Sequence, residues 1–273
     1  MIQKRSVLIT VLALVSIFLG QALSRTINRL IVELMNDSML IGFILVGIAG
    51  VILLATRINT PGIKGTLIGF IAGLLIWRGF VDGPMRVFAE IFSMGAIDFG
   101  GFPLSGRYAL LMSTLPVMLA MLVLYGLLSQ ETRCNFMRFT LRCLRWSPGK
   151  PTPDMPRSVA RITAVETVFV QWGIFLLFLF LGGALSNPFY IAMLVWLVYL
   201  LYKLLKLSQV DYAFRYAIPV CVILFSLVEV GAFFGLYPEP WQNPGEYPIT
   251  IVVMSIAFFG CLFQLVKMQE AET

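Results

Sequence analysis

The stretch MLIGFILVGIAGVILLAT, residues 39–56, contains no charged side chain and is dominated by leucine, isoleucine, valine, alanine and glycine. It lies between the polar residues Asn36 to Ser38 and the basic residue Arg57. A helix needs about 20 predominantly apolar residues to cross the hydrocarbon core of a bilayer. We therefore predict a transmembrane helix over residues 39–56.

The same pattern recurs along the whole chain. Of its 273 residues 59% are hydrophobic and only 12% are charged, whereas soluble domains have about 25% charged residues. Together with 39–56, we predict eight spans, at 6–23, 39–56, 64–81, 109–128, 165–185, 188–203, 215–236 and 248–267. The sequence thus predicts an all-α, polytopic integral membrane protein with one membrane domain over residues 1–273.

The absence of histidine excludes several chemistries. Bis-histidine haem ligation, imidazole-bound copper or zinc, and Ser-His-Asp or Cys-His catalysis all require that residue. The four cysteines show neither C-x-x-C nor zinc-site spacing, which favours apolar packing or free thiols. We expect no metal and no cofactor.

The distribution of lysine and arginine predicts the orientation. If the N-terminus is cytoplasmic, all but five of the 20 basic residues fall on the inner side. The five exceptions are Arg25, Arg29, Arg78, Arg86 and Arg107. Cytoplasmic loops carry an excess of lysine and arginine, so we predict that both termini are cytoplasmic, in a bacterial cytoplasmic membrane.

The N-terminal segment and the basic loop 129–164 can each be interpreted in two ways. Lys4-Arg5 followed by an apolar stretch and Ala22-Leu-Ser24 also fits a cleaved secretory signal, although we favour an uncleaved first span. The basic loop 129–164 is interpreted as a juxtamembrane amphipathic helix rather than a nucleic-acid-binding patch. The net charge of +6 is explained by this topological bias, and we expect no nucleic-acid partner.

Two segments on the outer side have amphipathic patterns. Within 24–37 the polar residues fall on one helical face, and within 82–94 the charged residues Asp82, Arg86 and Glu90 are spaced four apart. Asp82 is placed to cap the second helix, and Pro84 suits its first turn. We predict two interfacial helices that lie on the outer membrane surface.

Small residues in the third predicted span indicate close helix packing. Gly65, Gly69 and Gly73 form a doubled G-x-x-x-G pattern, which places all three on one face of a helix. We predict that this face packs against the second span or against a second subunit. In the fourth span, Ser113-Thr114-Leu-Pro116 predicts a kink. There the hydroxyl groups donate hydrogen bonds to backbone carbonyls that the kink leaves without an N–H partner.

The most informative positions are charges at membrane depth. Arg78 and Glu229 each lie about fourteen residues into a span that runs outward, so both are about 20 Å from the inner boundary. Because a lone charge at this depth is costly, we predict that the two residues pair or share one polar cavity. The pair is interpreted either as a fixed salt bridge or as a gate, a proton carrier or a substrate anchor.

A polar group of residues follows on the outer side: Asp82, Arg86, Glu90, Asp98 and Arg107. These side chains fit three interpretations: solvation of the loop, binding of a periplasmic partner, or acid–base catalysis on a lipid-linked substrate. Only the last of these requires the carboxylates to share a cleft.

Three classes of function remain open. The first is a non-enzymatic subunit, scaffold or anchor of a larger inner-membrane assembly, with the bilayer and other membrane or periplasmic subunits as partners. The second is a small-solute or ion transporter that uses Arg78 and Glu229. The third is a membrane-embedded enzyme acting at the outer face. The sparse polar content of the spans favours the first class, so we expect that the protein is not an enzyme.

Overall fold

The computed structural model describes residues 4–99, 102–128, 158–184, 186–233 and 236–271. The helices are α1 (Lys4–Met35), α2 (Met39–Thr56), α3 (Gly62–Trp77), α4 (Gly83–Ile91), α5 (Gly106–Ser113), α6 (Leu115–Leu128), α8 (Val159–Ala184), α9 (Ser186–Leu204), α10 (Val210–Phe233) and α11 (Pro248–Glu270). Short helical turns lie at η1 (Asn36–Ser38), η2 (Arg78–Asp82) and η3 (Pro240–Gln242). The strands β1 (Ile97–Phe99) and β2 (Phe102–Leu104) form a small antiparallel pair.

The chain is an all-α polytopic membrane protein, as the sequence predicts. Among the described residues, 6 helical segments are long and apolar enough to cross a bilayer, and α9 is a shorter apolar helix. The remaining predicted span, 109–128, is helical but divided at Thr114 into α5 and α6. The Ser113 and Thr114 hydroxyls donate to the carbonyls of Leu110 and Leu111, each over 2.6 Å, which confirms the predicted break and its capping.

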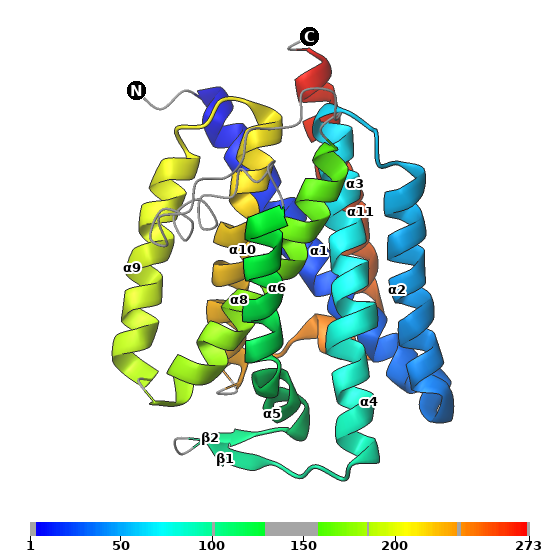
Figure 1. Cartoon of the computed structure of the whole chain (residues 1–273). Helices are drawn as coiled ribbons and strands as arrows, with labels where there is room; N and C mark the ends of the chain where they lie inside the picture. Colours follow the sequence, from blue (N-terminus) through cyan, green and yellow to red (C-terminus); the bar gives the residue numbers. More distant parts are fainter. Residues whose placement is uncertain (1–3, 100–101, 129–157, 185, 234–235, 272–273) are drawn as a thin grey trace.

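Four helices form the centre of the bundle (Figure 1). α3 packs along α8, α1 packs along α10, and α10 also contacts α8. The main apolar core includes Ile9, Ile17, Phe70, Phe214 and Ile218, all nearly or completely buried. In soluble proteins, removal of such side chains from water is the largest favourable contribution to the free energy of folding. Between helices in a bilayer, close van der Waals contact contributes more. α2, α9 and α11 lie at the outside of this bundle and expose apolar side chains.

Both ends of the described chain lie on one side of the bundle, which we call the termini side; the opposite side is the far side (Figure 1). Arg5 Nη2 donates to the Met268 carbonyl over 3.3 Å, and Lys64 pairs with Glu270 at 2.9 Å. These contacts join the start of α1, the start of α3 and the end of α11. The first span is integral to the core, because Ile9 is completely buried there.

The two predicted surface helices differ from the structure. Residues 24–35 continue α1 without a break, because no glycine or proline interrupts the chain from Gln21 to Met35. Residues 83–91 form α4, which continues α3 through the π-helical turn η2. Both segments are therefore extensions of spans rather than separate interfacial helices. The predicted cap is also wrong: Asp82 has helical backbone angles and makes no capping hydrogen bond, although Pro84 does lie in the first turn.

The doubled G-x-x-x-G face of α3 contacts α8, whereas we expected the second span or another subunit. A Cβ atom at Gly65 or Gly69 would collide with backbone atoms, those of Thr60 and Ala160 respectively. At Gly73 the added atom would lie 2.8 Å from Cβ of Thr167. The absence of side chains on this face therefore allows α3 and α8 to approach backbone to backbone. α2 packs on another face of α3.

Most of the predicted basic loop falls outside the described residues. The segment 129–157 is not described, and the remainder of 129–164 includes the first turns of α8, which begins at Val159. The interpretation of this loop as an amphipathic helix therefore remains a prediction. That residues 1–273 form one membrane domain also remains a prediction.

Candidate functional site

Five charged residues gather at the far side of the central bundle. We call them the far-side charge cluster: Arg25 on α1, Arg78 and Asp82 on η2, Arg107 on α5 and Glu229 on α10. Their positions in the sequence span more than 200 residues. Helix packing of α1 against α10, and the extension of α3 through η2, bring them together.

Arg25 and Glu229 form the ion pair between α1 and α10. Their side chains are only 10% and 18% exposed, respectively. The Arg25 guanidinium also lies over two aromatic rings, 5.1 Å from the centroid of Phe225 and 5.6 Å from that of Phe175. An arginine held by a carboxylate and by aromatic faces has little freedom to move, so this pair is rigidly placed.

Arg78 and Asp82 form the second ion pair, which is almost completely buried. Arg78 Nη1 lies 2.7 Å from Asp82 Oδ2, and Arg78 Nε donates to Ser24 Oγ over 3.0 Å. Asn28 Nδ2 donates to the same Asp82 oxygen over 2.8 Å. Ser24 and Asn28 lie on α1 next to Arg25, so the two ion pairs share one helix as a support.

The π-helical turn sets the position of this second pair. π-helical turns are rare and occur most often at functional sites. In η2 the backbone approaches α2 so closely that a Cβ at Gly79 would collide with the backbone of Gly47. A Cβ at Gly83 would collide with the Phe43 ring. The two glycines therefore permit the turn that directs Arg78 and Asp82 into the bundle.

Arg107 adds a third guanidinium at the edge of the cluster. Its Nη1 atom lies 3.8 Å from Asp82 Oδ1, and its Nη2 atom donates to Tyr108 Oη over 2.6 Å. The Arg107 side chain is 24% exposed, more than that of Arg78 or Asp82. The cluster therefore holds three cations and two anions, with its third cation closest to the surrounding solvent.

Several polar atoms of this region have no hydrogen-bond partner. Among the described residues they include Arg25 Nε and Arg78 Nη2 within the cluster, and Trp77 Nε1 and Gln21 Nε2 next to it. Buried polar groups in native proteins are nearly always hydrogen-bonded. Unused donors beside an excess cation are the arrangement that an anionic group would satisfy.

Some of the site residues predicted from the sequence belong to the far-side charge cluster, and the others lie outside it. Arg78 and Glu229 both belong to the cluster, but their direct ion-pair partners are Asp82 and Arg25. Arg86 and Glu90 lie 3.7 Å apart on α4, with 55% of the Glu90 side chain exposed.

Asp98 lies on β1 and is exposed. Since Glu90 is exposed as well, Asp82 is the buried carboxylate of this set, and the three acids do not share a cleft.

Arg25 was missed as a site residue, because its segment was assigned to the membrane surface. A signal was present: Gln21, Ser24, Arg25 and Asn28 recur at helical spacing and form a polar stripe on α1. The stripe continues on the face of the first span that carries Ser6 and Thr10, which are buried. Helical periodicity identified the stripe but not whether it faces water or protein.

Polar side chains also lie in the bundle between the cluster and the termini side. Thr163, Thr167 and Gln171 on α8 are each at least 99% buried, facing a region lined by α3. Within the same stretch of the bundle, Arg215 Nη2 contacts both oxygens of Glu166, at 3.0 and 2.9 Å, and at the start of α10 Asp211 accepts a hydrogen bond from Thr66. We call the Glu166–Arg215 and Thr66–Asp211 contacts the termini-side pairs.

In the part of the chain that the structure describes, no group of three or more cysteine, aspartate or glutamate side chains is placed to hold a metal ion. Comparison of the chain with protein-family models, with curated proteins and with solved structures finds no match. The function must therefore be argued from the geometry of these residues.

Proposed function

We propose that this protein is a membrane transporter for a small solute that carries a negative charge, and that the far-side charge cluster binds the solute. The observation that carries the proposal is the composition of the cluster. Arg25, Arg78 and Arg107 face Asp82 and Glu229, and two guanidinium donors remain without partners. Planar guanidinium groups bind carboxylates and phosphates through paired hydrogen bonds.

The energetics support a binding role for the cluster. Charged groups inside a membrane are costly and usually occur in pairs. A purely structural role is met by equal numbers of opposite charges, as in the Glu166–Arg215 pair. A third arginine beside two carboxylates leaves a net positive charge, which an anionic solute would neutralise.

The interior polar residues support movement of a solute rather than binding alone. Gln171, Thr167 and Thr163 lie on successive turns of α8 and are buried, and Glu166 lies on the same helix between Thr163 and Thr167. α8 contacts α3 through the glycine face, where the two backbones lie close together, and small sliding movements of packed helices are one way in which proteins change conformation. Alternating access in transporters works through such movements of packed helices.

The other two classes receive less support from the geometry. The subunit interpretation relied on the sparse polar content of the spans, on the outer surface helices and on the doubled G-x-x-x-G face, and that face packs against α8 of the same chain. The enzyme interpretation required the outer carboxylates in one cleft, whereas Glu90 and Asp98 are exposed and Asp82 is buried. A role within a larger inner-membrane assembly stays as the competing outcome of the test below.

The orientation belongs to the same proposal. Lys4, Arg5, Lys64 and Lys267 lie towards the termini side, which supports a cytoplasmic location for that side. The cluster would then face the periplasm of a bacterial cell. A reporter enzyme that is active only in the periplasm should be inactive when fused to the C-terminus; activity there would contradict this orientation.

The transport proposal is tested by ligand stabilisation followed by flux. The purified protein is heated in mild detergent with potassium chloride, phosphate, acetate or succinate. An anion that binds the folded state stabilises it by about 2.7 kcal/mol at a concentration of 100 Kd. The melting temperature rises as a result. The stabilising anion is then tested for flux into proteoliposomes. Arg107→Gln should reduce both effects, while Arg29→Gln is the control, because Arg29 pairs with Glu33 on the exposed side of α1.

Mass spectrometry of the same preparation distinguishes the competing class. Absence of stabilisation by every anion, together with stoichiometric partner proteins that remain bound in the Arg107→Gln variant, would reject transport in favour of an assembly subunit. Stabilisation and flux by a chain that purifies alone would reject the subunit interpretation.

A further inference from the structure

A pocket of about 360 Å³ lies at the termini side, between the end of α9 and the start of α10. We call it the Tyr–Lys pocket; it is lined by Tyr199, Lys203, Lys206, Leu207, Tyr212 and Tyr216. It lies on another part of the molecule from the far-side charge cluster, at the opposite end of the bundle (Figure 1). Its chemistry is independent of the transport proposal.

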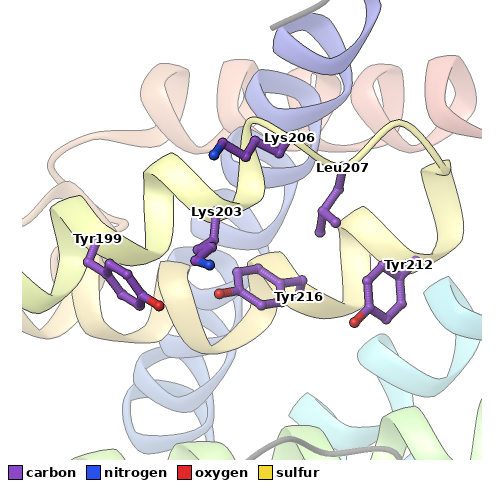
Figure 2. A pocket seen from close by; sticks show the side chains of 6 residues that line it. All are labelled: Tyr199, Lys203, Lys206, Leu207, Tyr212 and Tyr216. Atoms are coloured by element: carbon purple, nitrogen blue, oxygen red, sulfur yellow. The ribbon is translucent and has the colours of Figure 1, made fainter. Parts of the chain in front are cut away.

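The lining residues combine cations with hydroxyl groups and include no carboxylate. Figure 2 shows the ammonium group of Lys203 and the hydroxyl groups of Tyr199 and Tyr216 directed towards the same region. The second cation, Lys206, comes from the turn that follows α9. A pair of ammonium groups and several hydroxyl donors is the chemistry that binds a phosphate group.

The two lysines are held by aromatic rings rather than left to extend freely. Lys203 Nζ lies 5.5 Å from the ring centroid of Tyr199, and Lys206 Nζ lies 3.9 Å from that of Tyr202. Cation–π contacts restrict the positions of the ammonium groups. Lys203 is therefore held by a ring that lines the pocket, and Lys206 by the ring of Tyr202 beside it.

The pocket continues into an exposed and largely apolar face of α9. On α9, Val195, Val198, Tyr199 and Tyr202 lie on one face by helical spacing, and each of them is more than half exposed. This face runs from the pocket towards the middle of the membrane-spanning region. A ligand that fits both parts has a phosphate headgroup and an acyl chain.

We propose that the Tyr–Lys pocket binds the headgroup of an anionic phospholipid, with an acyl chain of the lipid along the exposed face of α9. Tyrosines with apolar rings and polar hydroxyls occupy the headgroup level of membranes, and basic residues near the membrane attract anionic lipids. The apolar continuation of the pocket selects a lipid over a free phosphate.

The test compares lipid retention by the full chain and by matched variants. The protein is reconstituted in vesicles of phosphatidylglycerol and phosphatidylcholine, extracted gently, and examined by native mass spectrometry. We expect one phosphatidylglycerol to remain bound preferentially. The double variant Lys203→Gln, Lys206→Gln should lower that population roughly tenfold or more, because two contacts to an anionic headgroup are removed.

Lys267→Gln is the matched control. Lys267 is also exposed near the termini side and lies 4.8 Å from the Phe263 ring centroid, but it does not line the pocket. It should retain phosphatidylglycerol as the unchanged protein does. Since all three lysines are exposed, equal melting temperatures will show that the variants fold.

Three outcomes would overturn the proposal. The first is the absence of preferential phosphatidylglycerol retention by the unchanged protein. The second is an equal loss in the Lys267→Gln control. The third is displacement of the lipid by inorganic phosphate or glycerol phosphate at similar concentrations, which would indicate a site for a free phosphate. Failure of anion transport at the far side would leave this result unaffected, and the reverse also holds.

Discussion

The two ends of the central bundle handle buried charge in different ways. On the termini side Glu166 has one cationic partner, Arg215, and Asp211 accepts a hydrogen bond from the neutral Thr66. On the far side, two carboxylates face three guanidinium groups, while buried polar atoms without partners occur at both ends, among them Arg78 Nη2 and Arg215 Nε. Paired charges suffice to fix helix register, whereas an excess of one sign has a structural cost that a bound counter-charge offsets. The difference assigns architecture to one end and ligand binding to the other.

The largest expected effect comes from removing Glu229. Glu229→Ala leaves Arg25 buried without its carboxylate, which should destabilise the protein by about 3–5 kcal/mol. The double variant Arg25→Met, Glu229→Leu removes both charges and should lose much less. Thermal unfolding in detergent measures both. The single variants Arg25→Met and Glu229→Leu complete the cycle: if the double variant loses the sum of their two losses, the ion pair is not coupled and the far-side cluster is not a unit.

A second prediction compares one arginine from each end. Arg215→Gln leaves Glu166 without a cation, so we expect a loss of about 3 kcal/mol. Arg107→Gln removes the excess cation of the far side and should cost less than about 1 kcal/mol, because its side chain is partly exposed and Asp82 keeps Arg78.

The comparison depends on the order of these two losses rather than on their absolute sizes. Equal melting temperatures for the two variants would mean that Arg107 is as firmly paired as Arg215. The contrast between the matched Glu166–Arg215 pair and the third cation of the far side would then be lost, and with it the main support for an anion site.

A further prediction concerns the contact that joins the two ends. At Gly69 a methyl group would collide with the Ala160 carbonyl, so Gly69→Ala should separate α3 from α8 at a cost of about 1–3 kcal/mol. Gly260→Ala is the control, because a Cβ there meets no atom within 4 Å. We expect no loss of melting temperature for the control. An equal response of both variants would show that the α3–α8 approach does not hold the two ends together.

The sequence predicted those parts of the fold that depend on local apolar content. The helix α2 spans residues 39–56 as expected, since an uninterrupted apolar stretch between polar flanks leaves little choice. The break in the fourth span was also predicted, because Thr114 and Pro116 act locally on the helix backbone.

The parts that depend on distant contacts were not predicted. The polar stripe around Arg25 has the same helical periodicity on a membrane surface as in a protein interior, and only the position of α10 decides between them. The partners of Arg78 and Glu229 depend on where η2 turns, which is set by the approach of Gly47 on α2. Matching depth in the membrane placed both residues in one region but did not give their contacts.

The π-helical turn η2 also affects how this protein will align with relatives. An α-helix rotates by about 100° per residue, and a π-helical turn holds one residue more than an α-helical turn. A homologue with a single deletion between Arg78 and Asp82 would retain the membrane crossing, but α4 would be rotated by about 100° and Asp82 would leave the bundle. A one-residue gap at this position in an alignment would therefore mark a change of function within an unchanged topology.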